Sequence, residues 1–356
     1  MSDSSASRAA AAGGIVLMTL AAGQFVMALD TTVMNTAIAT VADDLGTTVT
    51  GIQTAITMYT LVMASFMITG GKIGEILGRK KVFAIGCIIY ACGSLTTALA
   101  PNLTVLMIGW SGLEGLGAVL IMPAVVALVA SNFEKPDRPR AYGLVAAAGA
   151  IAAALGPLIG GFFTTYASWR WVFAGEVVIV IGILFLTRRM ADTPPEKNVK
   201  LDMVGTLLSA TGLGLLVFGI LRSGSWGFVQ PKPGAPEWFG LSPVIWLILA
   251  GGVALAAFIA WENRRIAEDK GALFDPTMLK NLELRGGVVS FFFMFMVQAG
   301  LFFCVPLFLS IALGLSAIET GVRLLPLSLS LLIFAAGIPR LLPDVSPRKV
   351  VRFGFM

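Results

Sequence analysis

The sequence contains no histidine, only three cysteines and few charged residues. The absence of histidine excludes histidine-based general-base catalysis and histidine metal sites. Cys87 and Cys92 lie close together in one apolar segment, and Cys304 lies far away in another. We interpret all three as small packing residues rather than as a disulfide or a metal site. We therefore expect no metal site and no bound cofactor.

The low charge content is typical of a membrane protein. Charged residues make up 13% of the chain, whereas a soluble domain has about 25%. Hydrophobic residues make up 57%, and the mean hydropathy is +0.88. So few charges cannot cover a water-facing surface, so lipid must face much of the chain. The net charge of +5 does not indicate nucleic-acid binding, because the basic residues fall in short loops on one side of the predicted membrane.

Ten apolar segments are long enough to cross a bilayer, which requires roughly 20 residues each. The apolar stretch after the polar start MSDSSASR is too long for a cleavable signal peptide. The sequence therefore predicts an all-α integral membrane protein with about ten transmembrane helices. The predicted spans are 14–40, 51–70, 82–100, 104–130, 141–164, 169–187, 203–221, 241–261, 286–310 and 317–339.

The basic residues are divided unequally between the two sides of this predicted topology. Most of the 25 Lys and Arg residues fall in loops on one side, and the other side has Arg170, Arg222 and Lys232. Under the positive-inside rule, the basic side is cytoplasmic. We expect a multi-pass protein of the cell membrane with a cytoplasmic N-terminus.

The loop after the second span reads GGKIGEILGRKKVF. Its glycines allow a tight turn and close helix approach, and a simple interpretation is a basic cytoplasmic loop. The pattern also resembles the cytoplasmic-loop signature of the major facilitator superfamily, in which this loop forms a latch that holds one conformation. Ile76 replaces a basic residue of that signature. The positions that carry the resemblance are Gly71, Gly78, Arg79 and Lys80, with Glu75 in place of the usual Asp.

The fifth span reads GLVAAAGAIAAALGPLIGG and resembles the antiporter signature of the same superfamily. Two glycines form a G-x-x-x-G face, and the proline removes one backbone donor, so the helix can bend or pack very closely. The simpler alternative is a tightly packed helix. The matching residues are Gly143, Gly156, Pro157, Gly160 and Gly161.

The first span resembles a signature of the superfamily's drug:proton antiporters, with matches at Asp30, Thr32, Asn35 and Ala37. An acid near the middle of a membrane costs a few kcal/mol and is usually functional. Asp43 and Asp44, at the outer end of the same span, are expected to be simply solvated.

Two more acids lie inside predicted spans. The fourth span resembles a further signature of the family, with matches at Gly115, Gly117 and Ala118. Trp110 occupies the position of an intramembrane Arg of that signature, and Glu114 follows one helical turn later. Burial penalises the charged form of a carboxyl, which suits a group that takes up and releases protons. With a rise of ~1.5 Å per residue, Glu176 lies roughly 9 Å below the outer end and Glu114 roughly 15 Å. We expect Asp30, Asn35, Glu114, Glu176 and Arg323 to couple protons and substrate.

Arg323 is a cation inside the tenth span. One hypothesis pairs it with Glu114 or Glu176 in one transport state. The alternative is that Arg323 extends to the outer surface.

Taken together, the motifs resemble the fourteen-helix drug:proton antiporter group, with a C-terminal half that is incomplete. The resemblance implies a proton-coupled antiporter that exports lipophilic or cationic drugs, with the bilayer, protons and a small molecule as partners. It also implies that the chain is not an enzyme. The alternative is a truncated, non-transporting membrane protein or a fragment of a longer transporter. The predicted divisions are a cytoplasmic N-terminus (1–13), a six-helix bundle (14–187), a linker (188–202), two additional helices (203–261), a cytoplasmic loop (262–285) and the start of a second bundle (286–356).

Overall fold

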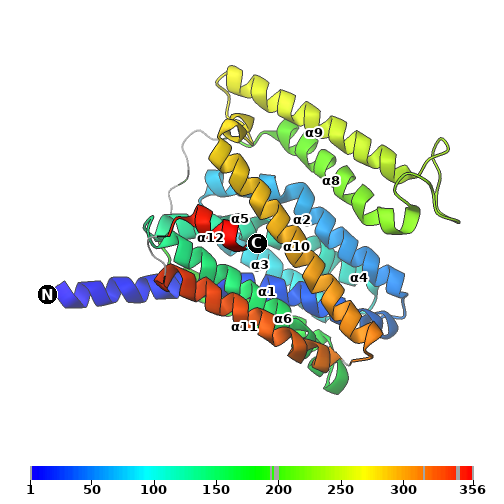
Figure 1. Cartoon of the computed structure of the whole chain (residues 1–356), viewed down its shortest axis with the longest axis horizontal. Coiled ribbons are helices and arrows are strands. Elements are labelled where there is room, and N and C mark those ends of the chain that lie inside the picture. Colours follow the sequence, from blue (N-terminus) through cyan, green and yellow to red (C-terminus); the bar gives the residue numbers. More distant parts are fainter. Residues whose placement is uncertain (1, 193–194, 196–199, 316, 342–344, 355–356) are drawn as a thin grey trace.

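The computed structural model describes residues 2–192, 195, 200–315, 317–341 and 345–354 (Figure 1). Within these residues the regular elements are helices, which confirms the predicted all-α class. The helices are α1 (Ser2–Asp44), α2 (Val49–Leu77), α3 (Arg79–Ala98), α4 (Leu103–Leu106), the π-helix η1 (Met107–Glu114), α5 (Gly115–Asn132), α6 (Arg138–Tyr166), α7 (Arg170–Thr187), α8 (Met203–Trp226), α9 (Pro243–Ala267), the 3₁₀ turn η2 (Pro276–Lys280), α10 (Leu282–Leu307), the π-helical η3 (Phe308–Ala312), α11 (Ala317–Leu341) and α12 (Pro347–Gly354).

The helix ends follow from local sequence signals. Thr48, Asn102, Asp202 and Ser242 act as N-caps of α2, α4, α8 and α9, and each side chain accepts a backbone hydrogen bond from the first turn. Gly78 separates α2 from α3 with φ +93°, a conformation that glycine adopts without strain.

Eight helical segments of the described chain are long and apolar enough to cross a membrane. They match the first eight predicted spans, and α4, η1 and α5 together form the fourth. The ninth and tenth predicted spans correspond to α10 and α11, and parts of both fall outside the residues whose side chains are described. The total of ten crossings therefore stays a prediction.

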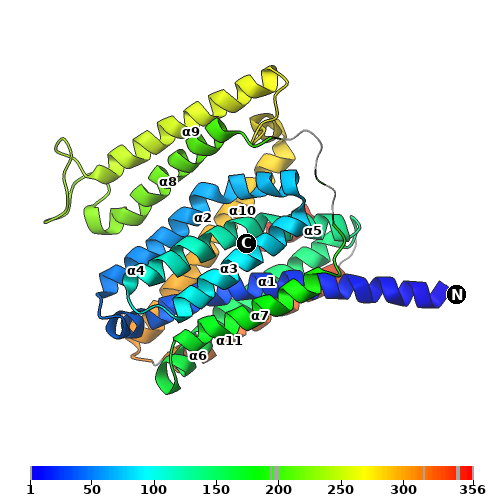
Figure 2. The same cartoon turned by 180° about the vertical axis from the view of Figure 1, so that it is seen from behind.

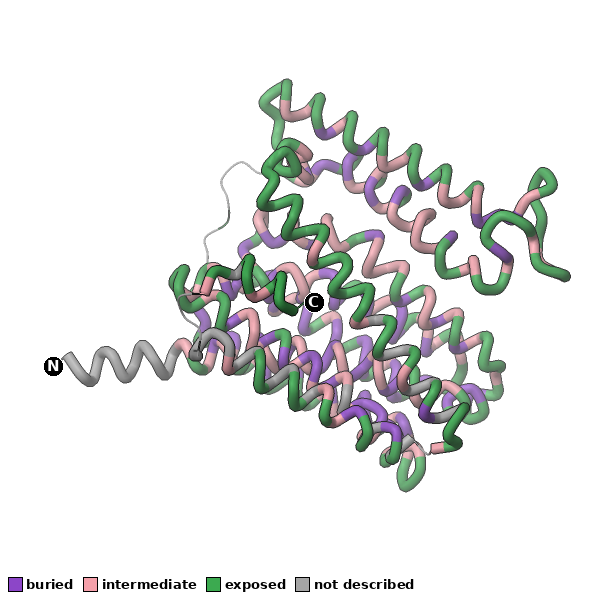
Figure 3. Tube along the Cα trace, in the orientation of Figure 1, coloured by how far each residue is buried: buried purple, intermediate pink, exposed green. Residues whose placement is uncertain are grey.

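The first seven α-helices form one packed bundle. In it, α1 lies along α6, and α3 lies between α5 and α7. Helices α8 and α9 pack as a pair, and α8 contacts α2 (Figures 1 and 2). Buried residues gather in the bundle, whereas α10 is mostly exposed along the part that is described (Figure 3). The packed core that could position a site is therefore the N-terminal bundle.

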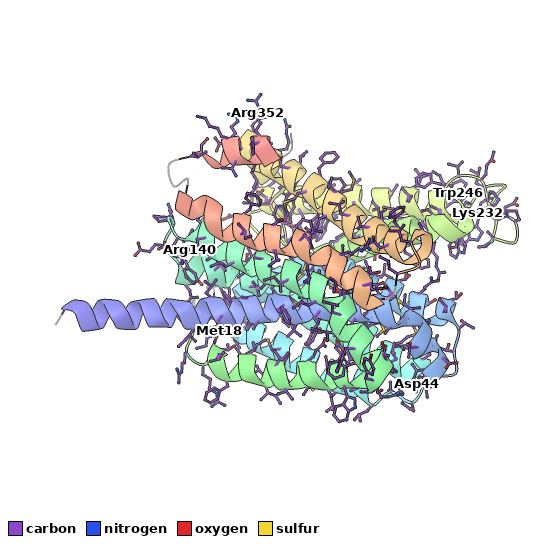
Figure 4. All side chains as sticks on the ribbon, turned by 60° about the horizontal axis from the view of Figure 1, so that its bottom comes forward. Met18, Asp44, Arg140, Lys232, Trp246 and Arg352 are labelled. Atoms are coloured by element: carbon purple, nitrogen blue, oxygen red, sulfur yellow. The ribbon has the colours of Figure 1, made fainter. Side chains whose placement is uncertain are left out.

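Contacts between neighbouring connections are found at both ends of the bundle. At one end, the ammonium of Lys80 donates to the carbonyl oxygen of Met190 over 2.7 Å, which joins the α2–α3 turn to the end of α7. At the other end, Arg170 forms an ion pair with Asp44. Arg140 lies at the end opposite to Asp44 and Lys232 (Figure 4). The basic α2–α3 turn lies beside Tyr142, at the start of α6, and therefore shares the end of Arg140, which we call the basic end of the bundle.

Candidate functional site

Three acids from different helices converge in the core of the first bundle. They are Asp30 of α1, Glu114 at the end of η1 and Glu176 of α7, and they are 0%, 0% and 1% exposed. One oxygen of each carboxyl lies within 4.8 Å of one oxygen of the other two. We call these three residues the acid cluster. The structure thus brings together three of the five residues that the sequence assigned to coupling.

Each carboxyl of the acid cluster accepts one side-chain hydrogen bond from a neutral donor. Trp110 Nε1 donates to Asp30 Oδ1 at 2.6 Å, Thr97 Oγ1 to Glu114 Oε1 at 2.9 Å, and Ser94 Oγ to Glu176 Oε2 at 3.0 Å. The second oxygen of each carboxyl is buried and has no hydrogen-bond partner among the described residues. The cluster therefore contains three oxygens that are free to accept a proton or another ligand.

Tyr90 adds a fourth polar group. Its side chain is fully buried, and its hydroxyl lies beside the carboxyls of Asp30 and Glu176. Within the described residues, this hydroxyl has no hydrogen bond of standard geometry.

The π-helix η1 positions one side of the cluster. It contains both Trp110 and Glu114, and π-helical turns are frequent at functional sites. The ring of Trp110 stacks on Tyr59 at a centroid distance of 4.9 Å, and Ser111 Oγ donates to the carbonyl oxygen of Ala55 at 2.8 Å. These contacts hold η1 against α2.

Glycines hold η1 against α3. A Cβ on Gly93 would lie 2.5 Å from Glu114 Cγ, and a Cβ on Gly109 would lie 2.8 Å from the backbone nitrogen of Thr97. Neither position has room for a larger residue, so the backbones themselves set the distance between Glu114 and its donor.

Asn35 and Arg323, the other two residues assigned to coupling, lie outside the acid cluster. Asn35 is exposed on α1, and its amide donates to the carbonyl oxygen of Thr31 at 2.8 Å. Arg323 is exposed on α11, which packs along α6. Among the described residues, neither forms a hydrogen bond or an ion pair with the cluster.

The predicted latch residues lie at the basic end of the bundle. Glu75 forms an ion pair of 2.9 Å with Lys72, one turn earlier in α2. Besides the bond from its ammonium to Met190, Lys80 donates its backbone N–H to Asp192 Oδ1 at 3.2 Å. A Cβ on Gly71 would contact Pro123 of α5 at 3.6 Å. The loop therefore joins α2, α3, α5 and the end of α7.

The predicted antiporter helix is α6, and its glycines face α1. A Cβ on Gly156 would lie 2.5 Å from Thr32 Cβ, and one on Gly160 would lie 3.3 Å from Val33 Cγ1. Pro157 lies inside α6, as do Gly143 and Gly161. The glycine pattern therefore lets α6 pack closely on the helix that contains Asp30.

A cavity of about 810 Å³ opens beside the latch. Arg79 is the charged residue of its lining, and the other lining residues are apolar or neutral. They are Met67, Ile68, Gly71, Met122, Pro123, Val126, Ala127, Ala130, Ser131 and Tyr142.

Two further sites were not predicted from the sequence. Asp44, expected to be solvated, pairs with Arg170 and also accepts the indole N–H of Trp169 at 3.0 Å. The sequence signal was present, because Asp44 ends the first span and Arg170 begins the sixth, both on the predicted outer side.

The second is an acid pair in α8 and α9. Asp202 Oδ2 accepts a hydrogen bond from Trp261 Nε1 at 2.7 Å, and Glu262 Oε2 accepts one from the backbone N–H of Leu273 at 2.8 Å. A Cβ on Gly205 would lie 2.6 Å from Asp202 Oδ2 and 2.4 Å from Glu262 Oε1, so both carboxyls pack closely against this glycine. This pair fixes the loop after α9 to the start of α8.

A bundle of apolar helices around buried carboxyls defines a multi-pass membrane protein of the transporter class. The family model of the major facilitator superfamily matches residues 20–356, and the chain belongs to that superfamily. This family membership confirms the predicted fold, and it agrees with the prediction that the chain is not an enzyme.

The relatives include antibiotic-resistance and export proteins. The puromycin resistance protein pur8 of Streptomyces alboniger is 31% identical over 94% of this chain and 64% of its own length. The cephamycin export protein CmcT of Amycolatopsis lactamdurans is 30% identical over 93% of this chain and 66% of its own length. The chain thus spans about two thirds of the length of these relatives.

Solved structures show the same fold. The proton:xylose symporter XylE has a TM-score of 0.59 with 13% identity, covering 96% of this chain and 71% of its own. The human organic anion transporter MFSD10 has a TM-score of 0.57 with 13% identity, covering 92% and 72%. At this identity the likeness concerns the fold alone.

Proposed function

We propose that this chain acts in a proton-coupled antiporter that exports lipophilic or cationic small molecules, drugs among them, across the cell membrane. The observation that supports this most directly is the acid cluster, because three buried carboxyls from three helices have no basic partner among the described residues. Relatives whose names refer to puromycin resistance and cephamycin export support the choice of cargo.

In this proposal, protons enter from the outer side and neutralise Asp30, Glu114 and Glu176. Neutralisation releases the substrate and favours return to the inward-facing state. Alternating access in such folds is a rocking of one half against the other. A membrane potential of 100 mV contributes about 2.3 kcal/mol for each charge that crosses.

The cavity beside the latch is the proposed entrance for substrate from the cytoplasm, because it lies at the basic end of the bundle. Asn35 is assigned to substrate contact, since it is exposed on the same helix as Asp30. The latch residues are proposed to stabilise one conformation, and the glycines of α6 to let that helix move against α1.

Arg323 is proposed to pair with Glu114 or Glu176 in a conformation other than the present one. If exchange of the charges at positions 323 and 176 restores nothing that the single variants lose, this pairing is wrong.

The function is tested by the efflux of a fluorescent lipophilic cation from cells that lack their own multidrug exporters. Glu114→Gln should abolish efflux driven by a pH gradient, because its side chain cannot exchange a proton. Glu262→Gln is the matched control, since Glu262 is equally buried but lies in α9, outside the cluster. Expression levels are compared by immunoblot.

Undiminished efflux in Glu114→Gln would contradict the role of this carboxyl. Wild-type efflux no higher than that of the empty vector would contradict export by this chain.

A further inference from the structure

The acid cluster has the composition of a site for a hard cation. Its three carboxyl groups are at least 99% buried, and one oxygen of each lies within 4.8 Å of the others. Three points with that spacing always have a common point within about 2.8 Å, which is 4.8 Å divided by the square root of three. A single ion at that point would contact all three carboxyls.

The hydrogen bonding of the cluster independently favours a cation ligand. Asp30 Oδ2, Glu114 Oε2 and Glu176 Oε1 are buried and have no partner among the described residues. The hydroxyl of Tyr90 is also buried without a hydrogen bond of standard geometry, and it lies beside Asp30 and Glu176. Buried polar atoms are normally satisfied, so four oxygens in one place without a standard hydrogen bond favour a bound ligand.

The negative charge of the three carboxylates also favours a bound cation. The hydrogen-bond donors on the carboxyls, Trp110, Thr97 and Ser94, are neutral. Burying even one unpaired charge costs several kcal/mol, and three adjacent carboxylates would also repel one another. A bound cation would remove much of this cost.

We propose that the acid cluster binds a dehydrated hard cation of calcium size, such as Ca²⁺ or Na⁺, between Asp30, Glu114 and Glu176. Calcium–oxygen distances are 2.3–2.6 Å, so an ion of this size fits after a contraction of a few tenths of an ångström. Mg²⁺ binds at 2.0–2.1 Å with strict octahedral geometry, so it would require a larger contraction. No metal site was expected from the sequence, because it has no histidine and no cluster of cysteines, whereas the ligands of this site are carboxylates.

This inference goes beyond export, because cation binding requires neither a substrate nor a gradient. The test is equilibrium binding of ⁴⁵Ca²⁺ and, separately, ²²Na⁺ to the purified chain in nanodiscs at pH 8.5. The expected result is saturable binding of one ion per chain for at least one of the two, with Mg²⁺ a weaker competitor than the unlabelled form of that ion.

Variants locate the site. Asp30→Asn, Glu114→Gln and Glu176→Gln should each weaken binding at least tenfold, because loss of even an outer contact of a metal site costs 10–100-fold. Glu262→Gln, a buried acid outside the cluster, should bind as the wild type does. Three separate cluster variants keep the test decisive if one of them fails to fold, which size-exclusion chromatography shows.

Binding of Ca²⁺ alone or Na⁺ alone supports the site and identifies its ion. The proposal is overturned if neither Ca²⁺ nor Na⁺ binds, if Mg²⁺ binds as tightly as whichever of these two ions binds, or if the folded cluster variants retain wild-type binding. Loss of efflux with intact cation binding would count against the export function only.

Discussion

The indole N–H of Trp110 donates a hydrogen bond of 2.6 Å to Oδ1 of Asp30, and both side chains are fully buried. The signature that the fourth span resembles has an arginine at the position of Trp110. Here a neutral donor replaces that cation and fixes Asp30 without neutralising it. The charge of the cluster must therefore be compensated by a bound proton or ion.

Replacing Trp110 with Phe tests this hydrogen bond. The variant keeps an aromatic ring to stack on Tyr59 but removes the donor, so we expect a loss of about 1–3 kcal/mol in the free energy of unfolding. The measurement is denaturant unfolding of the purified protein in detergent. Trp246→Phe is the control, because its indole donates to a backbone carbonyl and its side chain is partly exposed to solvent, whereas Trp110 is fully buried. Equal effects of the two variants would contradict the prediction.

Adding a methyl group at Gly93 tests the close packing behind Glu114. The new Cβ of Gly93→Ala would lie 2.5 Å from Glu114 Cγ, so η1 must shift, and we expect a destabilisation of about 1–3 kcal/mol. Gly112→Ala, in the same π-helix, would have its nearest neighbour at an ordinary 3.6 Å. The melting temperature of Gly93→Ala should therefore be lower than that of Gly112→Ala. A melting temperature of Gly112→Ala below that of Gly93→Ala would contradict the packing described here.

The outer-end contact between Asp44 and Arg170 gives a smaller prediction. Both groups are partly exposed, so Asp44→Asn should cost about 1 kcal/mol or less, and less again at high salt. The neighbouring Asp43 is exposed and forms no ion pair among the described residues, so Asp43→Asn should have no effect. Melting temperatures at low and high salt check both statements. A salt-independent loss in Asp44→Asn would contradict the ionic origin.

The membrane orientation is tested by cysteine labelling. Ser225→Cys, near the end of α8, should react in intact cells with a maleimide that cannot cross the membrane, and Lys270→Cys, after α9, should not. Both positions are exposed in the structure. The background is a variant in which Cys87, Cys92 and Cys304 are replaced. Labelling of Lys270→Cys alone would reverse the proposed orientation.

The sequence was sufficient to predict the helices and the individual acids. Apolar length places eight of the spans to within a few residues, because a membrane helix must satisfy its own backbone. Asp30, Glu114 and Glu176 could be identified one at a time, since a charge inside an apolar run is conspicuous.

The sequence was not sufficient to predict that the acids meet. A constant rise along ideal helices places Glu176 and Glu114 at different depths, yet their oxygens lie within 4.8 Å. The π-helix that ends at Glu114 has no sequence signal, and it changes the direction of the following side chains. The ion pair of Asp44 was missed for a related reason, because its partner Arg170 is distant in the chain.

The contact between α3 and the helix formed by η1 and α5 has a consequence for movement. A methyl group on Gly117 would lie 2.9 Å from the carbonyl oxygen of Gly86, and the glycines at 93 and 109 continue this line of backbone contact. Two helices without intervening side chains cannot slide without breaking many contacts at once. The segments that contain Ser94, Thr97 and Glu114 therefore form one rigid wall, and any opening of the cluster toward either face of the membrane must come from displacement of α1 or α7.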